Sequence, residues 1–233
     1  MTFEFDHIPI EALGFKAFRI DTDVAPAHLY EEVTVPGRNG TLLMDTRRAA
    51  NVSYTVTCLV VGEIEPKLNA LKALLGSRRG YCRLEDSDHP DEYYMAVYKH
   101  ITEPKLDKNR EAAKVVLEFD RKPQRFLKSG EVTSTFTADG VLYNPAYGTA
   151  QPLIRAYGEG TFYVNGTAIT VNHADEYTDF DCEMMDAYKG TVNRNKYVTV
   201  GINYPVLAPA QNNTITLGTG ITRLDITPRW WRY

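Results

Sequence analysis

Cysteine and histidine are scarce in this chain. The three cysteines, Cys58, Cys82 and Cys182, are odd in number and lie far apart. This pattern fits reduced thiols that pack as small apolar side chains, and it argues against a disulfide framework or a cysteine-rich metal site. The five histidines are scattered singly, so they predict no ligand set.

Long apolar runs and catalytic motifs are also missing. No stretch near the amino terminus is long enough for a signal peptide or a membrane span, so we expect synthesis in a cytoplasm and no membrane association. Neither Gly-x-Ser-x-Gly nor His-Glu-x-x-His occurs. The glycine-containing segment 36–40 lacks the Lys-Ser/Thr pair of a nucleotide loop and predicts a hairpin turn instead. We therefore predict no enzyme, no catalytic residue, no cofactor and no metal.

Positive charge is not in excess. The 26 Lys and Arg residues against 30 Asp and Glu residues give a net charge of −4. This balance argues against specific nucleic-acid binding through a basic surface, although a wall past which DNA slides stays open. The acidic stretch 85–92, which includes His89, could hold a hard cation. A solvated turn is favoured, because the spacing lacks the glycine and the terminal glutamate of a calcium loop.

A second acidic group alternates along one segment. Asp179, Asp181 and Glu183 lie at two-residue intervals, so they would share one face of a strand. Neighbouring carboxylates need a metal or raised pKa values before they can do acid–base chemistry. We favour a wet strand edge or a subunit contact over a catalytic set.

The segment 115–126 divides the chain into two parts. Val115, Leu117 and Phe119 alternate with other residues at the period of a strand that has one buried face. Pro123 then removes a backbone donor, so the strand should end before it. The following sequence is richer in Tyr, Thr, Asn and Gly. We predict two domains, residues 1–125 and 126–233.

The first part reads as a mostly antiparallel sheet with one helix. Alternating apolar residues and turn signals predict strands over 3–5, 15–20, 30–35, 41–44, 51–61, 80–84, 93–101 and 115–120. The helix should open at Glu65-Pro66, bury a leucine stripe and close at Gly76. That stripe comprises Leu68, Leu71, Leu74 and Leu75.

A hairpin is predicted over residues 30–44. The segment Pro36-Gly37-Arg38-Asn39-Gly40 joins its two strands, and Asn39-Gly40 should supply the positive backbone angles of a tight reversal. An exposed hairpin of this kind is a natural arm for reaching a neighbouring subunit or extending its sheet.

The second part has short strands and no convincing helix. Strands are predicted over 132–137, 152–158, 161–164, 167–171, 177–181, 197–200, 213–217 and 221–227. The strand 152–158 should pair with 161–164, and Asn165-Gly166 should turn the chain into 167–171. Short strands at this spacing are typical of a β-sandwich.

Aromatic residues are frequent towards the carboxyl end. If the last strand runs on, Trp230 and Trp231 face opposite sides, so that one can be core and the other exposed. An exposed Trp beside Arg makes a sugar platform or an interface anchor, and shielding of both by a neighbouring loop is the alternative.

Several short segments occur in a characteristic order along the chain. They are Val35-Pro36-Gly37-Arg38-Asn39-Gly40, the leucine-striped helix, the hairpin at Asp88 to Tyr94, Leu117 to Pro123, Tyr163-Val164-Asn165-Gly166, Phe180 to Tyr188 and Pro228-Arg229-Trp230-Trp231. In this order they resemble the distal tail protein family of long-tailed phages, including prophage-encoded members. Cys182 stands where the family often has Ser or Thr.

This resemblance implies a mainly β protein of two domains. Residues 1–125 would be a ring-forming, sandwich-like antiparallel β assembly with one α-helix and an extended hairpin, and residues 126–233 a galectin-like or carbohydrate-module-like β-sandwich. The implied role is that of a hexameric adaptor ring in the virion tail tip, open to DNA passage, that joins the tail tube protein to the tail-associated hub protein and to a receptor-binding protein. A stand-alone carbohydrate-binding module is the alternative. Candidate contacts to sister copies or partners are Val35, Arg38, Asn39, Leu42 and Trp231.

Overall fold

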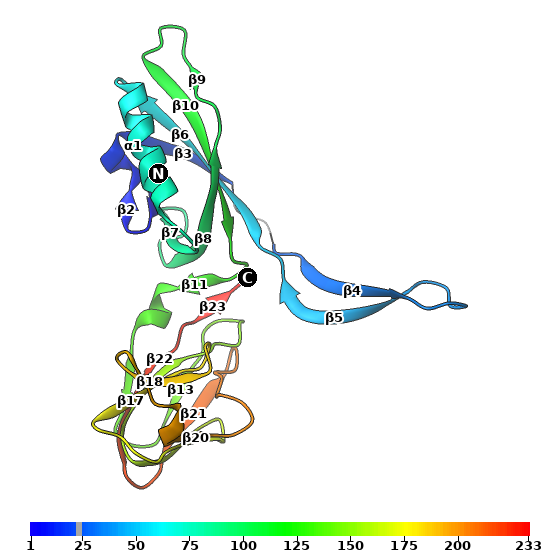
Figure 1. Cartoon of the computed structure of the whole chain (residues 1–233), viewed down its shortest axis with the longest axis vertical. Helices are drawn as coiled ribbons and strands as arrows, with labels where there is room; N and C mark the ends of the chain where they lie inside the picture. Colours follow the sequence, from blue (N-terminus) through cyan, green and yellow to red (C-terminus); the bar gives the residue numbers. More distant parts are fainter. Residues whose placement is uncertain (22–24) are drawn as a thin grey trace. The chain divides into compact units, whose positions relative to one another are not determined.

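The computed structural model describes residues 1–21 and 25–233. The chain divides into two compact units, Met1–Arg125 together with Tyr233, and Phe126–Arg232. Antiparallel strands make up most of both units, and the described residues include one α-helix, α1 (Ile64–Ser77) (Figure 1). The predicted mainly β class is confirmed.

The core of the first unit is built on one sheet. Its strands follow the order β2-β1-β7-β8-β10-β6-β3, with β9 beside β10. Their bounds are β1 (Phe3–Phe5), β2 (Ile8–Pro9), β3 (Phe15–Asp21), β6 (Val52–Val61), β7 (Cys82–Asp86), β8 (Glu92–Ile101), β9 (Lys105–Leu106) and β10 (Ala112–Arg121). A 3-10 turn, η1 (Ile10–Leu13), follows β2.

This sheet curls on itself. Phe3 on β1 and Tyr54 on β6 have ring centroids 6.2 Å apart. The two strands are four places apart in the sheet order, which would separate them by roughly 19 Å in a flat sheet. The aromatic core therefore lies inside the curve of the sheet, which accounts for the sandwich-like character of the first unit.

Strand β10 lies between β6 and β8 in the sheet. Val115, Leu117 and Phe119 are buried, whereas Val116 and Glu118 are partly exposed. The buried and partly exposed side chains of the folded strand therefore alternate as the sequence predicted. The strand also ends at Arg121, two residues before Pro123, as predicted.

Helix α1 packs its leucines into the hydrophobic core of the first unit. Leu68, Leu71 and Leu75 are buried, and Leu74 is only partly so. The predicted stop at Gly76 is wrong, because the helix runs to Ser77. A glycine ends a helix by adopting a positive φ, and Gly76 does not. No helix among the described residues combines the length and the apolar character needed to span a bilayer.

The second unit is a β-sandwich. One sheet has the order β12-β22-β14-β17-β18-β19 and the other β13-β21-β15-β16-β20. Phe162 on β15 and Phe180 on β17 meet between the sheets with ring centroids 5.6 Å apart. The bounds are β12 (Ser134–Phe136), β13 (Gly140–Tyr143), β14 (Leu153–Gly158), β15 (Gly160–Val164), β16 (Thr167–Val171), β17 (Tyr177–Asp181), β18 (Asp186–Lys189), β19 (Val192–Asn193), β20 (Val198–Val200), β21 (Asn212–Leu217) and β22 (Ile221–Thr227).

Four further elements are short. They are β11 (Arg125–Leu127), β23 (Trp231–Arg232) and the 3-10 turns η2 (Lys128–Glu131) and η3 (Asn195–Tyr197).

The predicted pairing of 152–158 with 161–164 is wrong. Strand β14 pairs with β17 and β22, whereas β15 pairs with β16 and β21 in the other sheet. Gly158 and Gly160 have φ angles of 99° and 153°, and the carbonyl oxygen of Gly220 lies 2.2 Å from the position that a Cβ of Gly158 would take. The two glycines therefore pass the chain from one sheet to the other. The predicted turn at Asn165-Gly166 is confirmed, with φ angles of 50° and 78°.

Candidate functional site

The β4–β5 hairpin is a small sheet of its own. Strands β4 (His28–Thr34) and β5 (Thr41–Ala49) pair antiparallel and, among the described strands, with no third strand (Figure 1). The connecting loop has positive φ angles at Gly37 and Gly40, 78° and 79°. The expectation of a positive angle at Asn39 is wrong, because two glycines of a longer loop supply the reversal.

Apolar side chains are exposed on both faces of this hairpin. Val33 is paired across the strands with Leu42, and their exposed fractions are both 41%. Met44 shares that face by alternation and is 51% exposed. On the opposite face, Leu43 is 56% and Tyr30 is 52% exposed. A two-stranded hairpin is marginally stable alone, and contiguous exposed apolar surface marks interaction sites. The hairpin therefore has the character of an unfilled interface.

Four of the five candidate contact residues lie together. Val35, Arg38, Asn39 and Leu42 are all exposed, in the hairpin loop or beside it on β5. Trp231 lies in β23, in the second unit.

The indole of Trp231 is half-buried. Its Nε1–H donates to the carbonyl of Thr149 at 2.9 Å. The neighbouring Trp230 is 4% exposed and belongs to the core of the second unit. Strand β22 ends at Thr227, so the tryptophans are not on the continued strand that the sequence suggested. This hydrogen bond fixes the orientation of the ring.

Asp179 and Asp181 of the acidic alternation lie on β17 and are buried, so the expected wet strand edge is wrong for them. Glu183 lies beyond the end of β17 and is exposed. Asp179 and Asp181 are 4% and 8% exposed, and β17 lies between β14 and β18 rather than at a sheet edge. Arg155 donates to both oxygens of Asp179 at 2.7 and 3.0 Å. Arg229 donates to both oxygens of Asp181 at 2.9 Å. These carboxylates therefore hold arginines in place.

The electrostatics of Asp181 agree with that role. Burial alone would raise the pKa of its carboxyl, but hydrogen bonds from Arg229 and from the backbone N–H groups of Met184 and Glu183 hold the pKa below its usual range. A carboxylate held ionised in this way accepts hydrogen bonds and is unsuited to donating a proton.

The acidic stretch 85–92 is organised around Asp86. This buried carboxylate accepts hydrogen bonds from the Tyr54 hydroxyl at 2.8 Å and from the backbone N–H groups of Asp88 and His89 at 2.9 Å. Burial, with Asp86 beside it, also raises the pKa of Tyr54 far above its ordinary value. The stretch is therefore a turn with an internal acceptor.

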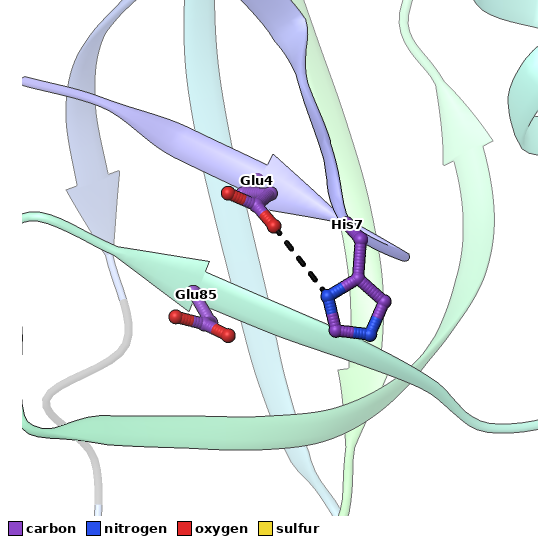
Figure 2. Close-up of side chains that lie close together, drawn as sticks. All are labelled: Glu4, His7 and Glu85. Carbon is purple, nitrogen blue, oxygen red and sulfur yellow. Dashed lines mark ion pairs between the residues drawn. The ribbon is translucent and has the colours of Figure 1, made fainter. Parts of the chain in front are cut away.

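Folding brings together one group that sequence spacing does not show. Figure 2 shows Glu4, His7 and Glu85, whose potential ligand atoms all lie within 4.8 Å of one another. Glu4 and Glu85 face each other across β1 and β7, which are far apart in the sequence. Glu85 already accepts from the Arg83 guanidinium at 2.5 Å, and His7 is exposed. We interpret the group as a surface ion-pair cluster.

The cysteines pack as expected. Cys58 and Cys182 are free thiols in the two cores, and Cys82 is partly buried. Burial raises the pKa of both core thiols to about 12, so they stay protonated near neutral pH.

The chain was compared with known proteins. No protein-family model and no curated protein sequence matches it. The crystal structure of the SPP1 Dit (gp 19.1) protein is similar, with a TM-score of 0.75 and 16% identity over 97% of both chains. A chain of the phage P2 baseplate in its activated conformation with Ca is also similar, with a TM-score of 0.50 and 12% identity over 94% of this chain and 91% of that chain. The expected resemblance to distal tail proteins is thus confirmed at the level of the fold, across both units.

Proposed function

We propose that this chain is a structural adaptor at the tip of a long phage tail. Six copies form a ring that joins the tail tube protein to the tail-associated hub protein and to the receptor-binding apparatus. The observation that carries this proposal is the exposed β4–β5 hairpin, on a chain whose fold matches the SPP1 Dit protein over 97% of its length.

The SPP1 Dit protein is described as a paradigm of the hub adsorption apparatus in phages that infect Gram-positive bacteria. The second similar chain belongs to a phage baseplate. These two descriptions support a place in the tail tip of a virion. They also support a binding and assembly role without catalysis. Synthesis in the host cytoplasm is part of the same proposal.

The hairpin supplies a physical means of assembly. A closed ring needs one surface on each copy to bind a different surface on the next copy. Val33, Leu42 and Met44 offer exposed apolar contacts, and burying the exposed remainder of each would contribute roughly 1 kcal/mol. Among the described strands, β4 and β5 each have an unpaired outer edge, which can also accept a strand from a neighbour.

The charge of the chain suits a ring with an open centre. Each copy has a net charge of −4. DNA carries one negative charge for about every 1.7 Å of duplex, so a mildly acidic lumen would not retain it. This supports passage of DNA past the ring without specific binding.

Light scattering after size exclusion tests the hairpin contact. Leu42→Asp places a charge within the apolar face of the hairpin, and Val192→Asp is a matched control on β19, where Val192 is 58% exposed. We expect the wild type and the control to form the same oligomer and Leu42→Asp to give monomers that are still folded, as their far-ultraviolet circular dichroism can show. Equal oligomers in all three proteins would refute the role of the hairpin.

A further inference from the structure

The second unit has a pocket that contains none of the candidate contact residues. Its volume is about 790 Å³. Its lining comes from the β15–β16 turn, the β17–β18 turn and the loop between β20 and β21. This volume lies within the range of about 300 to 1,000 Å³ that is typical of small-molecule sites.

The lining mixes polar and apolar side chains in similar measure and carries no charge. Gln151, Asn203 and Gln211 contribute exposed carboxamides, and each carboxamide offers two N–H donors and an acceptor oxygen. Tyr204 contributes a half-buried aromatic ring. None of the described residues that line the pocket is Asp, Glu, Lys, Arg or His, although 24% of the chain is charged.

We propose that this pocket binds a neutral glycan of a few sugar units. A sugar ring presents hydroxyl groups at its edge and C–H groups on its faces, so it matches carboxamides beside an aromatic ring. An anionic or cationic ligand would lose hydration in the pocket without gaining an opposite charge, which disfavours it.

A buried network holds the pocket in shape. Asn213 is fully buried, and its Nδ2 donates to the carbonyls of Leu142, Ala208 and Gln211. Its Oδ1 accepts from the Asn165 side chain at 2.7 Å. These bonds pin the loop on the Ala208–Gln211 side of the pocket.

The neighbouring parts of the pocket are fixed in the same way. Asn165 donates to the carbonyl of Val206 at 3.1 Å and accepts from the Thr214 N–H at 3.0 Å. On the other side, Asp181 accepts from the Met184 N–H and orders the turn that carries Met185. A lining that is ordered before binding loses less conformational entropy when a ligand enters.

Isosteric charge variants test the proposal on the full-length protein. Asn203→Asp and Gln211→Glu each replace an amide donor with a carboxylate of the same shape. Asn69→Asp, at an exposed position on α1, is the matched control. The probe is an array of neutral oligosaccharides of glucose, galactose, N-acetylglucosamine and N-acetylgalactosamine, printed beside sialylated, sulfated and uronic-acid glycans.

We expect the wild type to bind at least one neutral glycan. Titration calorimetry with that glycan should show about tenfold weaker binding by Asn203→Asp and by Gln211→Glu, and unchanged binding by Asn69→Asp. Melting curves establish that all variants are folded. Absence of binding to every neutral glycan, binding to anionic glycans alone, or equal affinity in the pocket variants would each overturn the assignment. The oligomeric state of the protein decides none of these outcomes, so the adaptor proposal stands or fails separately.

Discussion

Replacing Asp181 with asparagine should destabilise the second unit. The wild-type carboxylate accepts two hydrogen bonds from Arg229, both 2.9 Å long, and its Oδ1 also accepts the N–H groups of Glu183 and Met184. Asparagine keeps one acceptor oxygen but removes the charge and the second acceptor. Hydrogen bonds to charged groups contribute about 1.5 to 3 kcal/mol each. We therefore expect the free energy of unfolding to fall by about 2 kcal/mol.

Tryptophan fluorescence is a selective assay for this change. Both tryptophans of the chain, Trp230 and Trp231, lie in the second unit, so emission during urea unfolding reports on that unit. For a unit of this size the expected loss corresponds to a melting temperature lower by about 10 °C. Glu176→Gln is the control, because its 3.4 Å contact with Lys189 involves a carboxylate side chain that is 67% exposed. Such a pair contributes about 0 to 1 kcal/mol.

The pH dependence gives a second readout. The folded pKa of Asp181 lies below the value of about 3.9 for an unfolded aspartate. Its contribution is therefore fully present above that unfolded value and is lost as the pH falls through the folded pKa. Asp181→Asn should flatten this acid limb of the stability curve. A loss below about 0.5 kcal/mol at neutral pH, with an unchanged acid limb, would show that the pair with Arg229 does not stabilise the fold.

Three further predictions follow from burial. Leu71→Ala, at a fully buried position on α1, should lower the free energy of unfolding of the first unit by about 2 to 5 kcal/mol, as calorimetry can show. The unfolding of the second unit, followed by tryptophan fluorescence, should not change. Gly148→Ala would place a Cβ 2.5 Å from the indole of Trp231, so we expect a red-shifted emission maximum from the displaced ring. Iodoacetamide should label Cys82 in the native protein and the two core cysteines only after unfolding, as peptide mass mapping can show. Labelling of all three at one rate would contradict the packing of the cores.

The alternation of apolar residues predicted where the strands lie better than it predicted which strands pair. The alternation through Val115, Leu117 and Phe119 gives strand β10, because burial on one face has the same period as the side chains. The pairing of β14 was mispredicted, because strands that follow each other in sequence need not pair when glycines carry the chain to another sheet. The prediction that the helix ends at Gly76 was wrong, because a glycine at an exposed position can also continue a helix.

For the acidic alternation and the hairpin, the sequence pattern also did not predict which polar and apolar side chains are buried and which are exposed. An alternating set of carboxylates has the same sequence pattern at a wet edge and between two strands, so only the positions of Arg155 and Arg229 reveal Asp179 and Asp181 as buried ion pairs. The hairpin was predictable from its turn residues and strand pattern, but its exposure on both faces was not. The pocket joins segments 151, 165–167, 182–185, 203–208 and 211–214, which are far apart in the sequence and meet only in the folded chain.

The adaptor account rests on self-assembly, and native mass spectrometry with negative-stain microscopy of the full-length protein at high concentration tests it most directly. The account predicts a complex of six copies of the 26.3 kDa chain, seen as six-fold rings with an open centre. A protein that stays monomeric at the highest attainable concentration, or that forms closed particles without an opening, would contradict it.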